Sequence, residues 1–81
     1  MYKAIPALDL TAAEVELLIH AANMGGWLSV GYVDMSSVQP AFKRLQSRTP
    51  KPFVFKRQGG SRYELTPAGK GLVRQIKAQA G

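Results

Sequence analysis

The sequence contains no cysteine and a single histidine, His20. Disulfide bonds, iron–sulfur clusters, thiol nucleophiles and cysteine-based zinc sites are therefore excluded, as is a metal site built on several histidines. No apolar run approaches the roughly 20 residues that cross a bilayer. The first residues also lack the apolar stretch of a signal peptide. We therefore expect a cytoplasmic protein that does not interact with membranes.

Combinations of residues that perform catalysis are missing as well. The sequence offers no pair of carboxylates, no nucleophile–base pair, no phosphate-binding loop and no metal-ligand spacing. His20 shares its side of a predicted helix with Ala13, Glu16 and Asn23, which places it toward solvent. The sequence therefore predicts a protein that is not an enzyme and that holds no cofactor and no metal.

Acidic residues are scarce, and most of them lie in the first half of the chain. The 81 residues carry 11 Lys and Arg against five Asp and Glu, for a formal net charge of +6. Residues 1–40 contain one base and four acids (−3), whereas residues 41–81 contain ten bases and one acid (+9). This asymmetry favours a polyanionic partner for the second half, nucleic acid before anionic membrane. A solvated basic face that keeps a small domain in solution explains the charge equally well.

The length and the hydrophobic content predict one small folded domain. Eighty-one residues leave room for a single core, and a hydrophobic fraction of 46% is ordinary for a globular protein. The sequence contains no internal repeat. The expected elements are an N-terminal extension over residues 1–9, a helix over 11–24, a short helix over 29–35, a helix over 37–48, a hairpin over 53–66 and a helix over 67–79.

Local signals support the first long helix and the helix over 37–48. Thr11 and Glu14 have the spacing of a capping box, in which each side chain bonds to the backbone of the other residue. Gly25 and Gly26 end that helix. In the second case Ser37 is the expected cap, which places Pro40 in the first turn, where its missing N–H has no helical partner to lose.

Two strand-like runs flank a glycine pair that suits a tight hairpin turn. In one register four side chains of the hairpin face inward: Phe53, Phe55, Tyr63 and Leu65. Lys56, Arg57 and Arg62 then lie near the tip and toward solvent. Like charges that face each other across a hairpin lower its stability, so the arginines at this tip indicate a bound anion. Thr66 and Pro67 begin the last helix.

The order of these elements resembles the winged helix-turn-helix domains of bacterial transcription regulators, especially the MarR-like and related small regulators. Three stretches carry the resemblance: residues 27–33, residues 38–48 and, most specifically, residues 62–73, in which a strand ending in Leu-Thr runs through Pro, Ala and Gly into a basic helix. Two departures stand out. Thr-Pro-Lys-Pro replaces the usual glycine and apolar residue at 49–52, and the long flanking helices that make MarR-like dimers are missing. A monomer and a homodimer are therefore both open.

The resemblance implies an α+β fold with a three-helix core, a two-stranded β-hairpin wing and a C-terminal helix. It further implies that the helix over 37–48 lies in the major groove and that the wing contacts the DNA backbone or the minor groove. Gln39 suits adenine, and Lys43 or Arg44 suits guanine. The hydroxyls of the two serines before the helix suit phosphate oxygens or act as helix caps. The expected DNA-binding residues are Ser36, Ser37, Gln39, Lys43, Arg44, Ser47, Arg48, Lys56, Arg57 and Arg62.

The function expected from these residues is binding of double-stranded DNA, in a transcription regulator. About four to six phosphate contacts predict a log–log slope of affinity against salt near −4 to −5. The alternative is a winged-helix module that binds another protein, such as a phage or mobile-element inhibitor or an assembly subunit. Such a module would use its basic face on an acidic partner, or an apolar region formed by Tyr2, Ile5, Leu8 and Tyr32.

Overall fold

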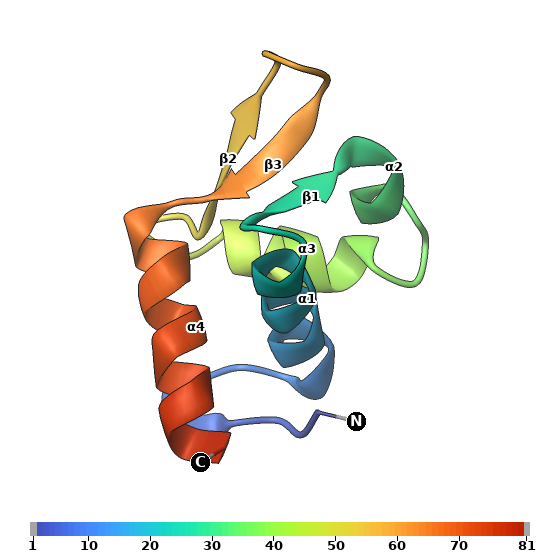
Figure 1. The fold of residues 1–81 in the computed structure, drawn as a ribbon. Coiled ribbons are helices and arrows are strands. Elements are labelled where there is room, and N and C mark those ends of the chain that lie inside the picture. Colours follow the sequence, from blue (N-terminus) through green and yellow to red (C-terminus); the bar gives the residue numbers. More distant parts are fainter. Residues whose placement is uncertain (1, 81) are drawn as a thin grey trace.

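The computed structural model describes residues 2–80 and, of these, the side chains of residues 2–79. This part of the chain forms an α+β domain with four α-helices, a short 3-10 helix and a three-stranded antiparallel sheet (Figure 1). In chain order the elements are η1 (Pro6–Leu8), α1 (Ala12–Asn23), β1 (Trp27–Ser29), α2 (Val30–Val33), α3 (Gln39–Gln46), β2 (Phe53–Lys56), β3 (Arg62–Leu65) and α4 (Pro67–Ala80).

The capping box expected at the start of α1 is present. The backbone N–H of Glu14 donates to Thr11 Oγ1 at 3.2 Å, and the N–H of Thr11 donates to Glu14 Oε1 at 2.8 Å. The helix ends at Asn23, before Gly25 and Gly26 with φ of 91° and 99°. Both ends of α1 are therefore determined by residues next to it in the sequence.

The expected cap of α3 is wrong. The helix begins at Gln39, and its N-cap residue is Val38, which makes no side-chain hydrogen bond. The N–H groups of Val38 and Gln39 both donate to the carbonyl of Met35 at 2.9 Å, so a turn of the backbone provides the acceptor that the Ser37 hydroxyl was expected to provide. Pro40 lies in the first turn, where its missing N–H removes no helical hydrogen bond.

The sheet has one strand more than the predicted hairpin. β1 pairs antiparallel with β3, and the strand order is β1-β3-β2. Across the hairpin, Phe53 faces Leu65 and Lys56 faces Arg62. The like charges that oppose one another are therefore Lys56 and Arg62, whereas Arg57 lies in the turn beyond the last pair.

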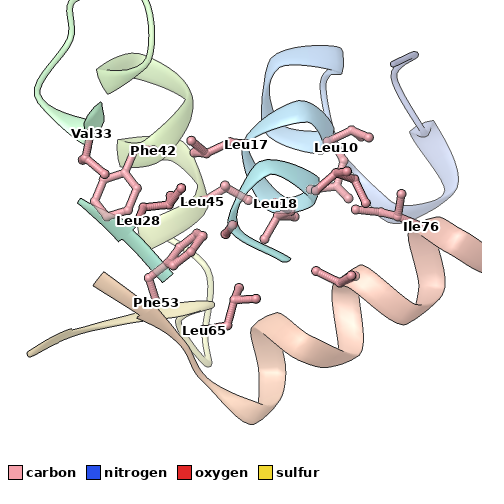
Figure 2. Close-up of a cluster of buried hydrophobic side chains, with 14 residues drawn as sticks. Leu10, Leu17, Leu18, Leu28, Val33, Phe42, Leu45, Phe53, Leu65 and Ile76 are labelled. Carbon is pink, nitrogen blue, oxygen red and sulfur yellow. The ribbon is translucent and has the colours of Figure 1, made fainter. Parts of the chain in front are cut away.

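The core lies where α1 is covered by α3 on one side and by α4 on another (Figure 2). Leu18 and Leu45 are fully buried there. Phe53, on the inner face of the sheet, belongs to the same buried cluster. Phe55 lies on the inner face of the hairpin, as expected, but it is not buried, since it is 45% exposed. Phe55 shares the inner face but lies farther along the hairpin, where its ring contacts only Tyr63 among the aromatic rings, at a centroid distance of 5.3 Å.

Within residues 2–80 no helix combines the length and the apolar character that a membrane span requires.

Candidate nucleic-acid interface

The outer side of α3 presents polar and basic side chains to solvent. Phe42 and Leu45 are buried on its inner side, so the helix turns Gln39, Lys43 and Ser47 outward. Lys43 makes no ion pair and no side-chain hydrogen bond with any residue of the described chain. Its ammonium group is therefore available to an external anion.

Ser36 and Ser37 lie in the exposed turn between α2 and α3. Neither hydroxyl caps α3. Between residues 2 and 80 neither hydroxyl has a hydrogen-bond partner. Both groups are free to donate to an oxygen of a ligand that lies against the start of α3.

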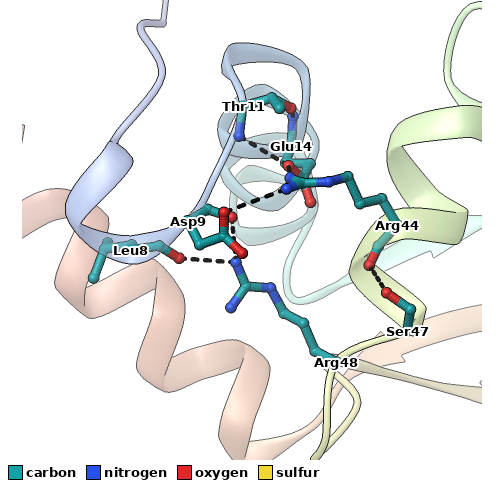
Figure 3. Close-up of polar contacts among 7 residues, drawn as sticks. All are labelled: Leu8, Asp9, Thr11, Glu14, Arg44, Ser47 and Arg48. Atoms are coloured by element: carbon teal, nitrogen blue, oxygen red, sulfur yellow. Dashed lines mark hydrogen bonds and ion pairs between the residues drawn. The ribbon is translucent and has the colours of Figure 1, made fainter.

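Arg44 is directed away from the outer side of α3 and toward the start of α1 (Figure 3). Its Nη1 donates to Glu14 Oε1, the oxygen that also takes part in the capping box, and its Nη2 lies 3.3 Å from Asp9 Oδ1. The hydrogen bond and the charge of Glu14, and then those of Asp9, raise the pKa of the Arg44 guanidinium. The Arg44 side chain remains about half exposed, whereas Glu14 is fully buried.

Glu14 has one carboxylate oxygen without a partner. Oε2 is buried and has no hydrogen-bond donor in the described part of the protein, whereas Oε1 accepts from both Thr11 and Arg44. The negative charge of this buried carboxylate is therefore balanced mainly by Arg44. Arg44, which the sequence predicts to contact DNA, thus also takes part in the packing of α3 on α1, and part of its guanidinium stays open to solvent.

Arg48 is also bound within the protein. Its Nη2 donates to the backbone carbonyls of Leu8 at 2.8 Å and Asp9 at 2.6 Å, so it ties the end of α3 to the segment before α1. Ser47 caps the same end of α3, and its hydroxyl donates to the Arg44 carbonyl at 2.6 Å. These two residues therefore stabilise the ends of elements rather than offering free donors.

The tip of the hairpin has two free cations. Lys56 and Arg57 are exposed and make no ion pair with residues 2–80. Arg62 differs, because its Nε and Nη2 both lie 2.8 Å from Glu64 Oε2 and its Nη1 donates to the Gln58 carbonyl. The self-repulsion expected at this tip is therefore reduced by Glu64, and the tip glycines need only the turn to explain their positive φ.

The ten candidate residues thus fall into two groups. Four residues are engaged inside the protein, namely the three arginines Arg44, Arg48 and Arg62 and the serine Ser47. The others lie at the start of α3, on its outer side or at the hairpin tip, and among them Lys43, Lys56 and Arg57 carry unpaired charge. The free positive charge of the predicted site is smaller than the sequence suggests.

Sequence reasoning left out a second group of free cations, on α4. Lys70, Arg74 and Lys77 are exposed, and none of them is ion-paired within residues 2–80. A signal for them is present in the sequence, because residues 67–80 contain three bases and no acid. The bases repeat at intervals of four and three residues, which places them on one side of a helix.

The apolar region considered for a protein partner is only partly exposed. Tyr2 is 43% exposed, whereas Ile5, Leu8 and Tyr32 are half-buried. Tyr2 and Ile5 line a hollow of about 450 Å³ beside the end of α4. Tyr32 lies elsewhere and stacks on His20 at a centroid distance of 4.5 Å, and burial, with a smaller effect of Glu16, raises the pKa of its hydroxyl. The expected region is thus two separate places on the surface.

No group of three or more His, Asp or Glu side chains in the described chain is placed to hold a metal ion. Comparison of the chain with protein-family models, with curated proteins and with solved structures gave no significant match.

Proposed function

We propose that this chain is a winged helix-turn-helix domain that binds double-stranded DNA and acts in transcription regulation. In this proposal α3 lies in the major groove, and the hairpin of β2 and β3 is the wing that contacts the backbone or the minor groove. The observation that carries the proposal is the free positive charge on these two elements. Lys43, Lys56 and Arg57 are exposed, and no acid in residues 2–80 neutralises them.

Affinity in this arrangement comes from contacts to phosphate, and sequence preference comes from the outer side of α3. Lys43 and the exposed part of Arg44 neutralise phosphates beside the major groove, and the two cations at the wing tip neutralise phosphates farther along the duplex. Gln39 has the two-point geometry that pairs with adenine, and Lys43 also reaches the acceptors of guanine. The hydroxyls of Ser36 and Ser37 donate to phosphate oxygens next to the start of α3.

Three internal arginine contacts position these elements. Arg44 and Arg48 join α3 to the start of α1 and to the segment before it, and Arg62 joins the wing tip to Glu64 on its own strand. The surface that meets DNA is thus fixed before binding, so little conformational entropy is lost in complex formation. In this proposal Arg48 and Arg62 are positioning residues rather than DNA contacts.

The first test is the salt dependence of binding to a random-sequence duplex, measured by fluorescence anisotropy. About four phosphate contacts give a log–log slope of the association constant against salt of about −3.6. Affinity should then fall roughly 150-fold between 50 and 200 mM salt. A slope near zero would contradict the proposal and favour the alternative, a winged-helix module that binds another protein.

The second test compares two substitutions that remove the same charge. Lys43→Gln should weaken duplex binding about five- to tenfold at 0.1 M salt and make the salt slope less steep by about 1, because one phosphate contact is lost. Lys3→Gln is the matched control, since Lys3 is exposed on the N-terminal segment, at the end of the molecule away from the wing (Figure 1). Equal effects of the two substitutions would show that net charge, and not the α3 surface, determines binding.

A further inference from the structure

The three cations of α4 form one exposed surface, here called the α4 face: Lys70, Arg74 and Lys77. The helix buries Val73 and Ile76 in the core, so the α4 face points away from α1. At a rise of 1.5 Å per residue its charges span about 10 Å along the helix. Like charges three and four residues apart lower the stability of a helix by a few tenths of a kcal/mol. Folding alone therefore does not explain their clustering.

The α4 face lies on another side of the molecule from the outer side of α3. Both helices pack on α1, which lies between them in Figures 2 and 3. Lys70, at the start of the α4 face, lines a hollow of about 510 Å³ together with Gly60 of the hairpin turn and Arg62 of β3, so this end of the α4 face approaches the wing. Arg74 and Lys77 lie farther along α4, on another side of α1 from α3.

We propose that the α4 face binds the phosphate backbone of a second DNA duplex, so that one molecule joins two duplexes. This inference rests on the proposed function, which assigns the first duplex to α3 and the wing. A duplex held by α3 and the wing would have to bend sharply to reach the α4 face as well, because DNA is stiff over lengths up to its persistence length of about 500 Å. The longest dimension of this domain is 34 Å.

A DNA backbone suits the α4 face better than an acidic protein does. Protein interfaces contain apolar or aromatic anchors at their centre and are depleted of lysine. Between residues 68 and 79 the exposed residues of α4 include no large apolar side chain: they are Lys70, Arg74, Gln75, Lys77, Ala78 and Gln79. A row of cations without an apolar side chain at its centre is complementary to DNA, which carries a phosphate charge at every nucleotide. Contacts to phosphate need no recognition of the bases.

The experiment is a capture assay with two duplexes of about 30 base pairs, in which one duplex is biotinylated and held on beads and the other is fluorescent and free. The α4 variant combines Lys70→Gln, Arg74→Gln and Lys77→Gln. The matched control variant removes the same charge from the first surface by Lys43→Gln, Lys56→Gln and Arg57→Gln. Sedimentation of each protein alone checks that it is a monomer, and thermal unfolding checks that it is folded.

Wild-type protein should capture the fluorescent duplex, and the α4 variant should reduce capture at least about tenfold through loss of three phosphate contacts. In single-duplex anisotropy the same variant should keep its affinity within about threefold and keep its salt slope, because the first surface is intact. The control variant should lose both capture and tight binding of a single duplex.

The outcomes separate the two proposals. A wild-type protein that binds one duplex with a steep salt slope but captures no second duplex overturns the bridging inference alone. Capture by the α4 variant at the wild-type level also overturns it, because the second duplex must then be held elsewhere or by a second protein molecule. A wild-type protein that binds no duplex overturns the proposed function and, with it, this inference.

Discussion

Replacing Gly69 by alanine should destabilise the domain by about 2 kcal/mol or more, although alanine is the better helix former by about 1 kcal/mol. A Cβ atom on Gly69 would collide with the carbonyl oxygen of Pro52 and would lie 2.8 Å from Leu65 Cδ2. The Pro52 oxygen cannot move freely, since it accepts the N–H of Thr66 at 2.9 Å. Overpacking of this kind outweighs the gain in helix propensity, and α4 must shift away from the loop before β2.

The same helix supplies the control for this prediction. A Cβ on Gly71 would meet only the Arg74 guanidinium at 3.8 Å, so Gly71→Ala should stabilise the domain by about 0.5–1 kcal/mol. Thermal unfolding followed by circular dichroism measures both variants, because 1 kcal/mol corresponds to a shift of about 4–8 °C in Tm at this size. Equal shifts of the same sign would mean that α4 does not approach Pro52 as described.

The second large effect is the change in stability caused by Glu14→Gln at the buried carboxylate. Whether this substitution lowers or raises stability should depend on Arg44. In the wild type, Glu14→Gln should lower the free energy of unfolding by about 1.5 kcal/mol, because a charge-assisted hydrogen bond becomes a neutral one. Arg44→Ala should be strongly destabilising, because it leaves a fully buried carboxylate without its cation. In the Arg44→Ala background Glu14→Gln should therefore raise stability, because it removes that uncompensated charge.

Urea unfolding of the four proteins in this cycle measures the coupling between the two side chains. Arg57→Ala is the control, because Arg57 is an exposed arginine without an internal partner and its removal should leave the transition midpoint unchanged. If Glu14→Gln destabilises equally in both backgrounds, the ion pair does not contribute to the packing of α3 on α1.

Apart from the cap of α3, the features that depend on neighbouring residues could be predicted from the sequence, and those that depend on distant residues could not. The spacing of Thr11 and Glu14 predicts the start of α1, and the capping box closes as expected. The same Glu14 also pairs with Arg44, 30 residues later, and nothing in the local pattern indicates that pair. The pairing of β1 with β3 is non-local in the same way.

Alternation along a strand predicts which face of the sheet a side chain occupies but not how deeply it is buried. Phe53 and Phe55 share one face of β2, yet the first is buried and the second is 45% exposed, because the hairpin extends beyond the helices that cover its base. For the candidate site, residue type predicted the positive charge of α3 and the hairpin. It could not predict that Arg44, Arg48 and Arg62 have partners inside the protein, since those partners come from packing.

The position of β3 in the middle of the sheet also determines when the domain can be completed during synthesis. β1 leaves the ribosome about 35 residues before its partner strand, and the register Leu28↔Tyr63 cannot form until that strand is made. Pairing over such a sequence separation slows folding relative to local contacts. A nascent chain that ends before Arg62 therefore exposes the apolar side of β1. A chaperone that recognises exposed apolar segments would bind the chain before β3 has been synthesised.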